Sequence, residues 1–195
     1  MIKDDLLKIL RDRSLKHAPP GKPFILASGK ESMTYLDVRQ TALSPQGHMV
    51  LGEMLYTEVI KLPDVEGVAG VELGGCPLAS AASMYSAYAG VLALKYMPVK
   101  PVRQFEALYV RKAAKEHGAK NLVEGAKRPG MKVVLLEDVV TSGGSSLRAI
   151  ETLKAEGLEV VSVIAVVDRE QGGGAAFASI NMPFSSLTTM KEILG

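Results

Sequence analysis

Two adjacent carboxylates, Glu137 and Asp138, follow the apolar residues 133–136 and precede a run of small and hydroxyl-bearing residues. Carboxylates accept hydrogen bonds from the vicinal hydroxyls of a ribose. Hydroxyl groups and backbone N–H groups at the start of a helix can hold a phosphate. The order of these groups predicts a site for a phosphorylated sugar, with the members Glu137, Asp138, Val139, Val140, Thr141, Ser142, Gly143, Gly144 and Ser145.

The same segment lacks the lysine of a nucleoside triphosphate loop. That loop has Gly, four residues and then Gly-Lys-Ser or Gly-Lys-Thr, and no lysine lies between Lys132 and Lys154. An alternative is that the acids and glycines only end a strand and cap the next helix. Two acids and two hydroxyl residues around paired glycines are more than a cap requires, which favours the binding site.

The elements that position this chemistry alternate between strands and helices. Residues 133–136 have the length and β-branched content of a strand buried on both faces of a parallel sheet. Thr189 and Glu192 predict a capping box for a terminal helix. The expected helices cover residues 2–13, 45–62, 78–89 and 142–156, and the expected strands cover residues 24–26, 35–37, 68–71, 91–94, 107–110, 131–137 and 158–167.

This alternation predicts an α/β fold with a mostly parallel sheet flanked by helices. We expect one domain over residues 1–195, with the N-terminal hairpin in a small hood (residues 1–44) and the sheet in a core (residues 45–195). Ligand loops then gather at one edge of the sheet. The expected loops are residues 73–77, 111–118, 137–145 and 168–174.

The composition is that of an ordinary soluble globular protein, with 47% apolar and 23% charged residues and a net charge of +2. The charge is too small to indicate nucleic acid, and no apolar run approaches the roughly 20 residues of a membrane span. The first residues lack the order of a signal peptide. We therefore expect a cytoplasmic protein that binds neither nucleic acid nor a membrane. The single cysteine, Cys76, is expected to be a small buried residue rather than a nucleophile.

Together these segments resemble the orotate phosphoribosyltransferases, within the type I phosphoribosyltransferases. Residues 137–145 are similar to the phosphoribosyl pyrophosphate motif of that superfamily. Residues 111–118 (Arg-Lys-Ala-Ala-Lys-Glu-His-Gly) resemble the family's mobile loop, and residues 24–37 resemble its N-terminal signature. Arg169, after Val-Asp, stands at the position of the arginine that family members use for the orotate carboxylate.

The resemblance implies a type I phosphoribosyltransferase-like fold and a reaction in which orotate displaces pyrophosphate from phosphoribosyl pyrophosphate. The product is orotidine 5′-phosphate, a step of uridylate synthesis (EC 2.4.2.10), and the cofactor is Mg²⁺. Arg111, Lys112, Lys115 and His117 are expected to bind the pyrophosphate, and His117 or a lysine to protonate it. The resemblance makes Lys112, Lys115, His117 and Asp138 the catalytic residues.

The mobile loop of the family reaches the neighbouring subunit, which implies a homodimer with shared active sites. Taken alone, residues 111–129 favour a solvated basic excursion from the sheet, whereas beside the phosphate motif they favour the pyrophosphate-binding loop. Tyr35 could cover the pyrimidine or belong to the core of the hood, and Arg169 could clamp the carboxylate or lie on the surface. Thr141 is expected to serve both the phosphate and the base.

Two positions depart from the family pattern. Some members carry a lysine where Ala27 or Gly74 stands, so pyrophosphate binding here would depend more on the mobile loop and on Mg²⁺. Two other functions remain open at this point: a phosphoribosyltransferase for another base, and a non-catalytic sensor of phosphoribosyl pyrophosphate. Sensors of this kind that regulate transcription usually add a basic DNA-binding module, for which 195 residues with a net charge of +2 leave little room.

Overall fold

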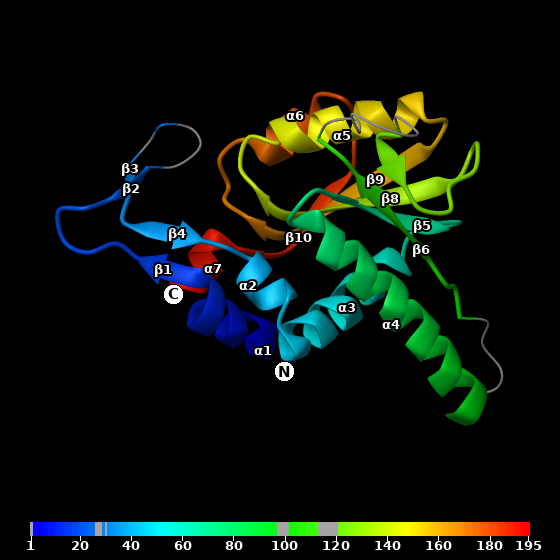
Figure 1. The fold of residues 1–195 in the computed structure, drawn as a ribbon, viewed down its shortest axis with the longest axis horizontal. Coiled ribbons are helices and arrows are strands. Elements are labelled where there is room, and N and C mark those ends of the chain that lie inside the picture. Colours follow the sequence, from blue (N-terminus) through cyan, green and yellow to red (C-terminus); the bar gives the residue numbers. More distant parts are fainter. Residues whose placement is uncertain (1, 26–28, 30, 97–101, 113–120) are drawn as a thin grey trace.

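The computed structural model describes residues 2–25, 29, 31–96, 102–112 and 121–195. Their centre is one six-stranded sheet with the order β10-β9-β8-β5-β6-β7 (Figure 1). The first five strands in this order run parallel, and β7 is antiparallel to β6. The strands are β5 (Gly67–Val71), β6 (Glu106–Val110), β7 (Val123–Glu124), β8 (Lys132–Val140), β9 (Glu159–Asp168) and β10 (Phe184–Thr189).

Helices cover both faces of the sheet, as the alternation predicts (Figure 1). Because successive side chains of a strand point to opposite faces, β8 contributes to two separate cores. Val134 and Leu136 join one core, and Val133 and Leu135 join the other. The first core includes α3 (Pro45–Val59) and α4 (Gly75–Tyr96), and the second includes α5 (Gly144–Ala155) and α6 (Gly173–Ala178).

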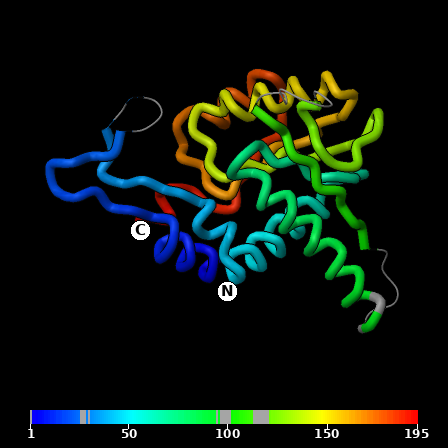
Figure 2. Tube along the Cα trace, viewed as in Figure 1, coloured from blue at the N-terminus to red at the C-terminus, as the bar shows by residue number. Residues whose placement is uncertain are grey.

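The hood lies beside one end of the sheet (Figure 2). Its first helix, α1, continues into a π-helical turn, and Leu6 and Leu10 pack in the same buried cluster as α3 and α4. The division into hood and core at residue 44 stays a prediction. The hood contains α1 (Ile2–Ile9), the π-helical turn η1 (Leu10–Ser14), β1 (Leu15–His17), β2 (Phe24–Ile25), β3 (Glu31–Ser32), β4 (Thr34–Leu36) and α2 (Arg39–Ala42).

The strand pairing of the hood differs from the predicted hairpin. The predicted hairpin pairs residues 24–26 with residues 35–37, which correspond to β2 and β4. In the structure β2 pairs with β3, and β4 pairs with β1 from the start of the chain. Local sequence signals the turn but carries no information on the distant partner, β1.

One predicted element is wrong in type. Residues 91–94 were expected as a strand but belong to α4, which is 22 residues long. A short apolar run cannot be assigned to strand or helix by periodicity alone. The expected loop at 168–174 is shorter than predicted, because α6 begins at Gly173, and the strands β7 and β10 have no counterpart in the prediction.

The end of the chain agrees with the sequence. Thr189 caps α7 (Met190–Leu194), with its hydroxyl accepting from Glu192 N–H and its own N–H donating to the Glu192 carboxylate. Cys76 is half-buried, and burial raises the pKa of its thiol. Among the described residues, none of the helices combines the length and the apolar character that a membrane span requires.

Candidate active site

The acidic pair lies at the carboxyl end of β8, inside the strand rather than after it. The strand was expected to end at Glu137, but it continues to Val140, which pairs with Asp168 of β9. Glu137 is only 4% exposed. Its Oε1 accepts hydrogen bonds from Ser146 Oγ at 2.8 Å and from Ser145 Oγ at 3.4 Å. The pair is thus held by the sheet and by the first turn of α5.

Burial controls the electrostatics of both acids. Burial, together with the smaller effect of the nearby Asp138, raises the pKa of Glu137 to about 7, against the lowering effect of the Ser146 hydrogen bond. Burial also raises the pKa of Asp138, whose Oδ1 accepts from the Val139 N–H at 2.8 Å. Neither acid forms an ion pair within the described ranges. Each therefore has oxygen lone pairs available for the hydroxyls of a ligand.

A cavity of about 330 Å³ lies in front of the pair, between the hood and the carboxyl ends of the strands. The hood supplies residues from β4 and α2, and the sheet supplies the ends of β5 and β8 and the residues after β5 and β6. The lining residues are Tyr35, Leu36, Asp37, Arg39, Val71, Glu72, Leu73, Gly74, Lys112, Glu137, Asp138, Val139 and Ser145.

The loop after β5 touches the acidic pair directly. A Cβ atom on Gly74 would lie 1.9 Å from Asp138 Oδ2, so the carboxylate occupies the space that any other side chain would need. Glu72 Oε1 accepts a hydrogen bond from Lys112 N–H at 2.7 Å. The expected loop at 73–77 is shorter, because α4 begins at Gly75. Gly74 thus brings this loop into contact with the acid that faces the cavity.

The predicted phosphate loop lies between β8 and α5. Thr141, Ser142 and Ser145 are exposed there. Gly143 has a φ of 79°, which favours glycine, and it precedes the first residue of the 12-residue helix α5. The N–H groups of a helix's first turn have no partner within the helix and attract anions. The loop can therefore hold a phosphate beside the acidic pair.

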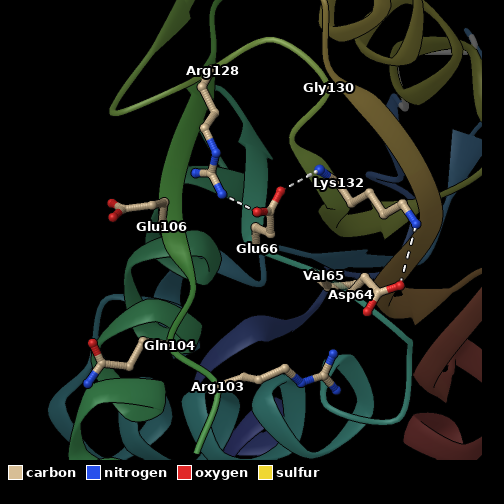
Figure 3. A pocket seen from close by; sticks show the side chains of 9 residues that line it. All are labelled: Asp64, Val65, Glu66, Arg103, Gln104, Glu106, Arg128, Gly130 and Lys132. Atoms are coloured by element: carbon tan, nitrogen blue, oxygen red, sulfur yellow. Dashed lines mark hydrogen bonds and ion pairs between the residues drawn. The ribbon is translucent and has the colours of Figure 1, made fainter.

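A larger cavity lies at the opposite edge of the sheet, at the amino ends of β5, β6 and β8 (Figure 3). Its charged groups bind one another: Arg128 pairs with Glu66, and Lys132 Nζ lies 3.6 Å from Asp64 Oδ2. In open α/β sheets ligands bind at the carboxyl ends of the strands. The smaller cavity beside Glu137 is therefore the candidate active site.

Known proteins resemble the chain over its whole length. The profile of the family described as "Phosphoribosyl transferase domain" matches residues 67–182. An orotate phosphoribosyltransferase from Sorangium cellulosum is 42% identical over 194 residues, which cover 98% of this chain and 93% of that relative. The chain belongs to the orotate phosphoribosyltransferase family.

Solved structures of the family have the same fold. The orotate phosphoribosyltransferase of Mycobacterium tuberculosis, in complex with Fe(III) dicitrate, has a TM-score of 0.80 at 28% identity and covers 99% of both chains. The same protein in complex with 5-phospho-alpha-D-ribosyl 1-diphosphate has a TM-score of 0.76 at 26% identity, with full coverage of both chains. The predicted α/β, type I phosphoribosyltransferase-like fold is confirmed.

The structure brings only some of the family's expected cations to the cavity. Lys112 lines it, whereas Arg111 lines a neighbouring cavity beside α5 and lies 3.8 Å from Glu124 through its Nη1. Lys115 and His117 lie outside the described residues, as does Ala27. The expected roles of Lys115 and His117 therefore stay predictions.

The two residues expected at the base differ in position. Tyr35 lines the cavity, is 36% exposed and lies 5.6 Å from the ring of Phe24. Arg169 follows β9, and its backbone N–H donates to the Val140 carbonyl. It is absent from the described lining of the cavity, yet its Nε is buried and has no hydrogen-bond partner in the part of the chain that the structure describes. A buried donor of this kind can serve an incoming carboxylate.

Sequence reasoning missed three charged residues of the cavity: Asp37, Arg39 and Glu72. Asp37 and Arg39 form an ion pair, which lowers the pKa of Asp37. The Asp-x-Arg spacing that begins at the last residue of the N-terminal signature (residues 24–37) is the signal that could have indicated them. Glu72 carries no such signal, since its role is to accept the Lys112 N–H from a different strand end.

The acids of the site suit a metal that arrives with its substrate. Within the described ranges no three or more His, Cys, Asp or Glu side chains form a metal-binding group. Mg²⁺ commonly binds through substrate phosphates and one or two carboxylates rather than in an all-protein site. Two carboxylates beside a phosphate loop fit a substrate-bound ion of this kind.

Proposed function

We propose that the cavity between hood and sheet is where this chain transfers a phosphoribosyl group to orotate. The reaction consumes phosphoribosyl pyrophosphate and gives orotidine 5′-phosphate and pyrophosphate, in pyrimidine nucleotide synthesis. One observation carries the proposal: the buried Glu137 and the half-buried Asp138, which form no ion pair within the described residues, lie on the same strand that leads into the phosphate loop. The related Mycobacterium tuberculosis enzyme was solved with the same phosphoribosyl donor.

The acidic pair would hold the ribose. As the bond from C1 to pyrophosphate breaks, positive charge grows on the sugar and negative charge grows on the leaving group. The carboxylates of Glu137 and Asp138 would accept hydrogen bonds from the ribose hydroxyls and lie near the developing positive charge. The 5′-phosphate would lie on residues 141–145, which fixes C1 relative to the incoming nitrogen.

The leaving group needs positive charge. Lys112 lines the cavity beside the loop of Glu72 and Gly74 and would bind the pyrophosphate. We assign the same task to Arg111, Lys115 and His117, with His117 or a lysine as the proton donor. Mg²⁺ would further neutralise the leaving group when bound, and Glu137 and Asp138 would help to hold it.

The base would lie between hood and sheet. Tyr35 would cover one face of the pyrimidine, and Thr141 would contact both base and phosphate. Arg169 would clamp the orotate carboxylate, a role for which its buried Nε, which has no hydrogen-bond partner among the described residues, is suited.

The expected dimer has a direct test. If one site uses Lys115 of one subunit and Arg169 of the other, mixing Lys115→Ala and Arg169→Ala subunits restores activity in some hybrids. The absence of any restored activity would contradict the shared site. The cytoplasmic location stays a prediction from the sequence.

Orotate absorbance provides the test of the function itself. We expect the purified protein to consume orotate only when phosphoribosyl pyrophosphate and Mg²⁺ are both present. Omission of each component is the control, and a panel of other bases measures specificity. No loss of orotate, together with turnover of another base, would contradict the proposal.

A further inference from the structure

Two cationic side chains line the described part of the active-site cavity, Lys112 and Arg39. The proposed reaction uses Lys112 for the leaving group but gives Arg39 no task. Arg39 is the first residue of α2 in the hood. It therefore approaches the cavity from the side of Tyr35.

The guanidinium of Arg39 is held in one orientation by Asp37. Arg39 Nε donates to Asp37 Oδ1 at 2.7 Å, and Nη2 donates to Oδ2 at 3.1 Å. The carboxylate also accepts from the Arg39 backbone N–H and from Gln40 Nε2. Asp37 is only 8% exposed. A buried acceptor with four contacts fixes the planar fork before any ligand arrives.

This pairing leaves part of Arg39 available. Within the described residues, no hydrogen bond engages Nη1, and the side chain is 41% exposed where it lines the cavity. Asp37 raises the pKa of the Arg39 guanidinium most, and Tyr35 and Asp138, which line the same cavity, add smaller effects in the same direction. Arg39 thus presents N–H donors between the aromatic ring of the hood and the acid that is expected at the ribose.

We propose that Arg39 binds the carboxylate of the anionic pyrimidine, and that Asp37 is the positioning residue that orients it. The inference rests on the proposed function and adds a second cation to Arg169. The location favours the base over the pyrophosphate, because Arg39 comes from the hood with Tyr35, whereas Lys112 and Gly74 belong to the opposite wall. A guanidinium already oriented by Asp37 loses little conformational entropy on binding, so little of the binding free energy of the carboxylate is offset.

Two nucleotides that differ only in the carboxylate test this assignment. Orotidine 5′-phosphate and uridine 5′-phosphate share ribose, phosphate and ring, so the ratio of their dissociation constants isolates the carboxylate. We define the ratio as the Kd of uridine 5′-phosphate divided by the Kd of orotidine 5′-phosphate. Isothermal titration calorimetry with Arg39→Ala should show orotidine 5′-phosphate binding weakened by about tenfold or more, since charge-assisted hydrogen bonds are lost, so the ratio falls. Uridine 5′-phosphate binding should change by less than about twofold.

Further variants separate orientation from charge. Arg39→Lys keeps the charge but not the fork and should restore the ratio only in part. Asp37→Asn leaves the guanidinium unoriented and should lower the ratio by a smaller factor than Arg39→Ala. Arg128→Ala is the matched control, because Arg128 pairs with Glu66 at the opposite edge of the sheet (Figure 3). It should leave both affinities unchanged.

The outcomes distinguish this inference from the proposed function. An unchanged ratio in Arg39→Ala, or an equal loss for both nucleotides, overturns the assignment of Arg39. A wild-type protein that does not distinguish the two nucleotides overturns it as well. A wild-type protein that distinguishes them but does not consume orotate contradicts the proposed function and leaves carboxylate recognition by Arg39 supported.

Discussion

The two walls of the active-site cavity both contain buried carboxylates, but the charges around them differ. On β8, Glu137 and Asp138 form no ion pair within the described residues, and burial raises both pKa values. In the hood, Asp37 is buried beside the Arg39 guanidinium, which lowers its pKa. Burial alone therefore does not define the role of an acid. The acids of β8 remain available to a ligand, whereas Asp37 is committed to orienting Arg39.

The largest expected effect is that of Asp138→Asn on activity. The amide keeps the shape but replaces one acceptor oxygen by a donor and removes the charge near the developing positive ribose. We expect kcat/KM to fall by about a hundredfold or more, with the unfolding temperature little changed. Initial rates of orotate consumption measure kcat/KM, and thermal unfolding followed by circular dichroism measures the unfolding temperature. Unchanged kinetics would remove Asp138 from the site.

Glu137→Gln tests the electrostatics of the same wall through stability. Since folding raises the pKa of Glu137 from 4.5 to about 7, the folded state holds a proton that the unfolded state releases. The free energy of unfolding therefore falls as pH rises between about 4.5 and 7. The variant lacks this titrating group, so its free energy of unfolding relative to the wild type should rise by about 2 to 3 kcal/mol from pH 5 to pH 8. Urea denaturation at both pH values measures the gain.

A pH-independent difference between Glu137→Gln and the wild type would mean that Glu137 is ionised throughout this range. The matched control is Asp37→Asn, whose stability effect has the opposite sign at neutral pH, because Asp37 is paired in the folded state. The two isosteric substitutions thus test directly whether folding shifts the pKa values of Glu137 and Asp37 in opposite directions.

Gly74→Ala tests whether the position of the Asp138 carboxylate matters for activity. The added Cβ would lie 1.9 Å from Asp138 Oδ2, so the carboxylate has to move. We expect about a tenfold loss in kcat/KM and little further loss in an Asp138→Asn background. Gly90→Ala in α4 is the control, since its Cβ would meet only Gln104 Nε2 at 3.4 Å. Additive losses in the double variant would show that Gly74 acts independently of Asp138.

The part of this site that the sequence predicts is the part built from consecutive residues. Strand β8, the acidic pair and the phosphate loop follow one another in the chain, so local pattern places Glu137 beside Ser145. The contact between Gly74 and Asp138 joins two different strand ends, and no local pattern encodes it. The Asp-x-Arg spacing marks Arg39 locally, but its place at the cavity depends on how β4 pairs with β1, which no local pattern encodes. Residues 91–94 were misassigned because the length of α4 is not visible in a four-residue apolar run.

The smallest expected effect is that of Asp37→Asn on stability. Asp37 has a lowered pKa in the folded state, so its pairing with Arg39 stabilises the protein above the unfolded pKa near 3.8, and this contribution is lost as pH falls through the lower folded value. Because Arg39 is 41% exposed, solvent screens the pair, and we expect a loss of only about 1 kcal/mol at pH 7. The loss should shrink towards pH 3, which urea denaturation at the two pH values would measure. An equal loss at both would assign the effect to the hydrogen bonds of the Asp37 carboxylate rather than to its charge, and would remove the electrostatic contrast between the two walls.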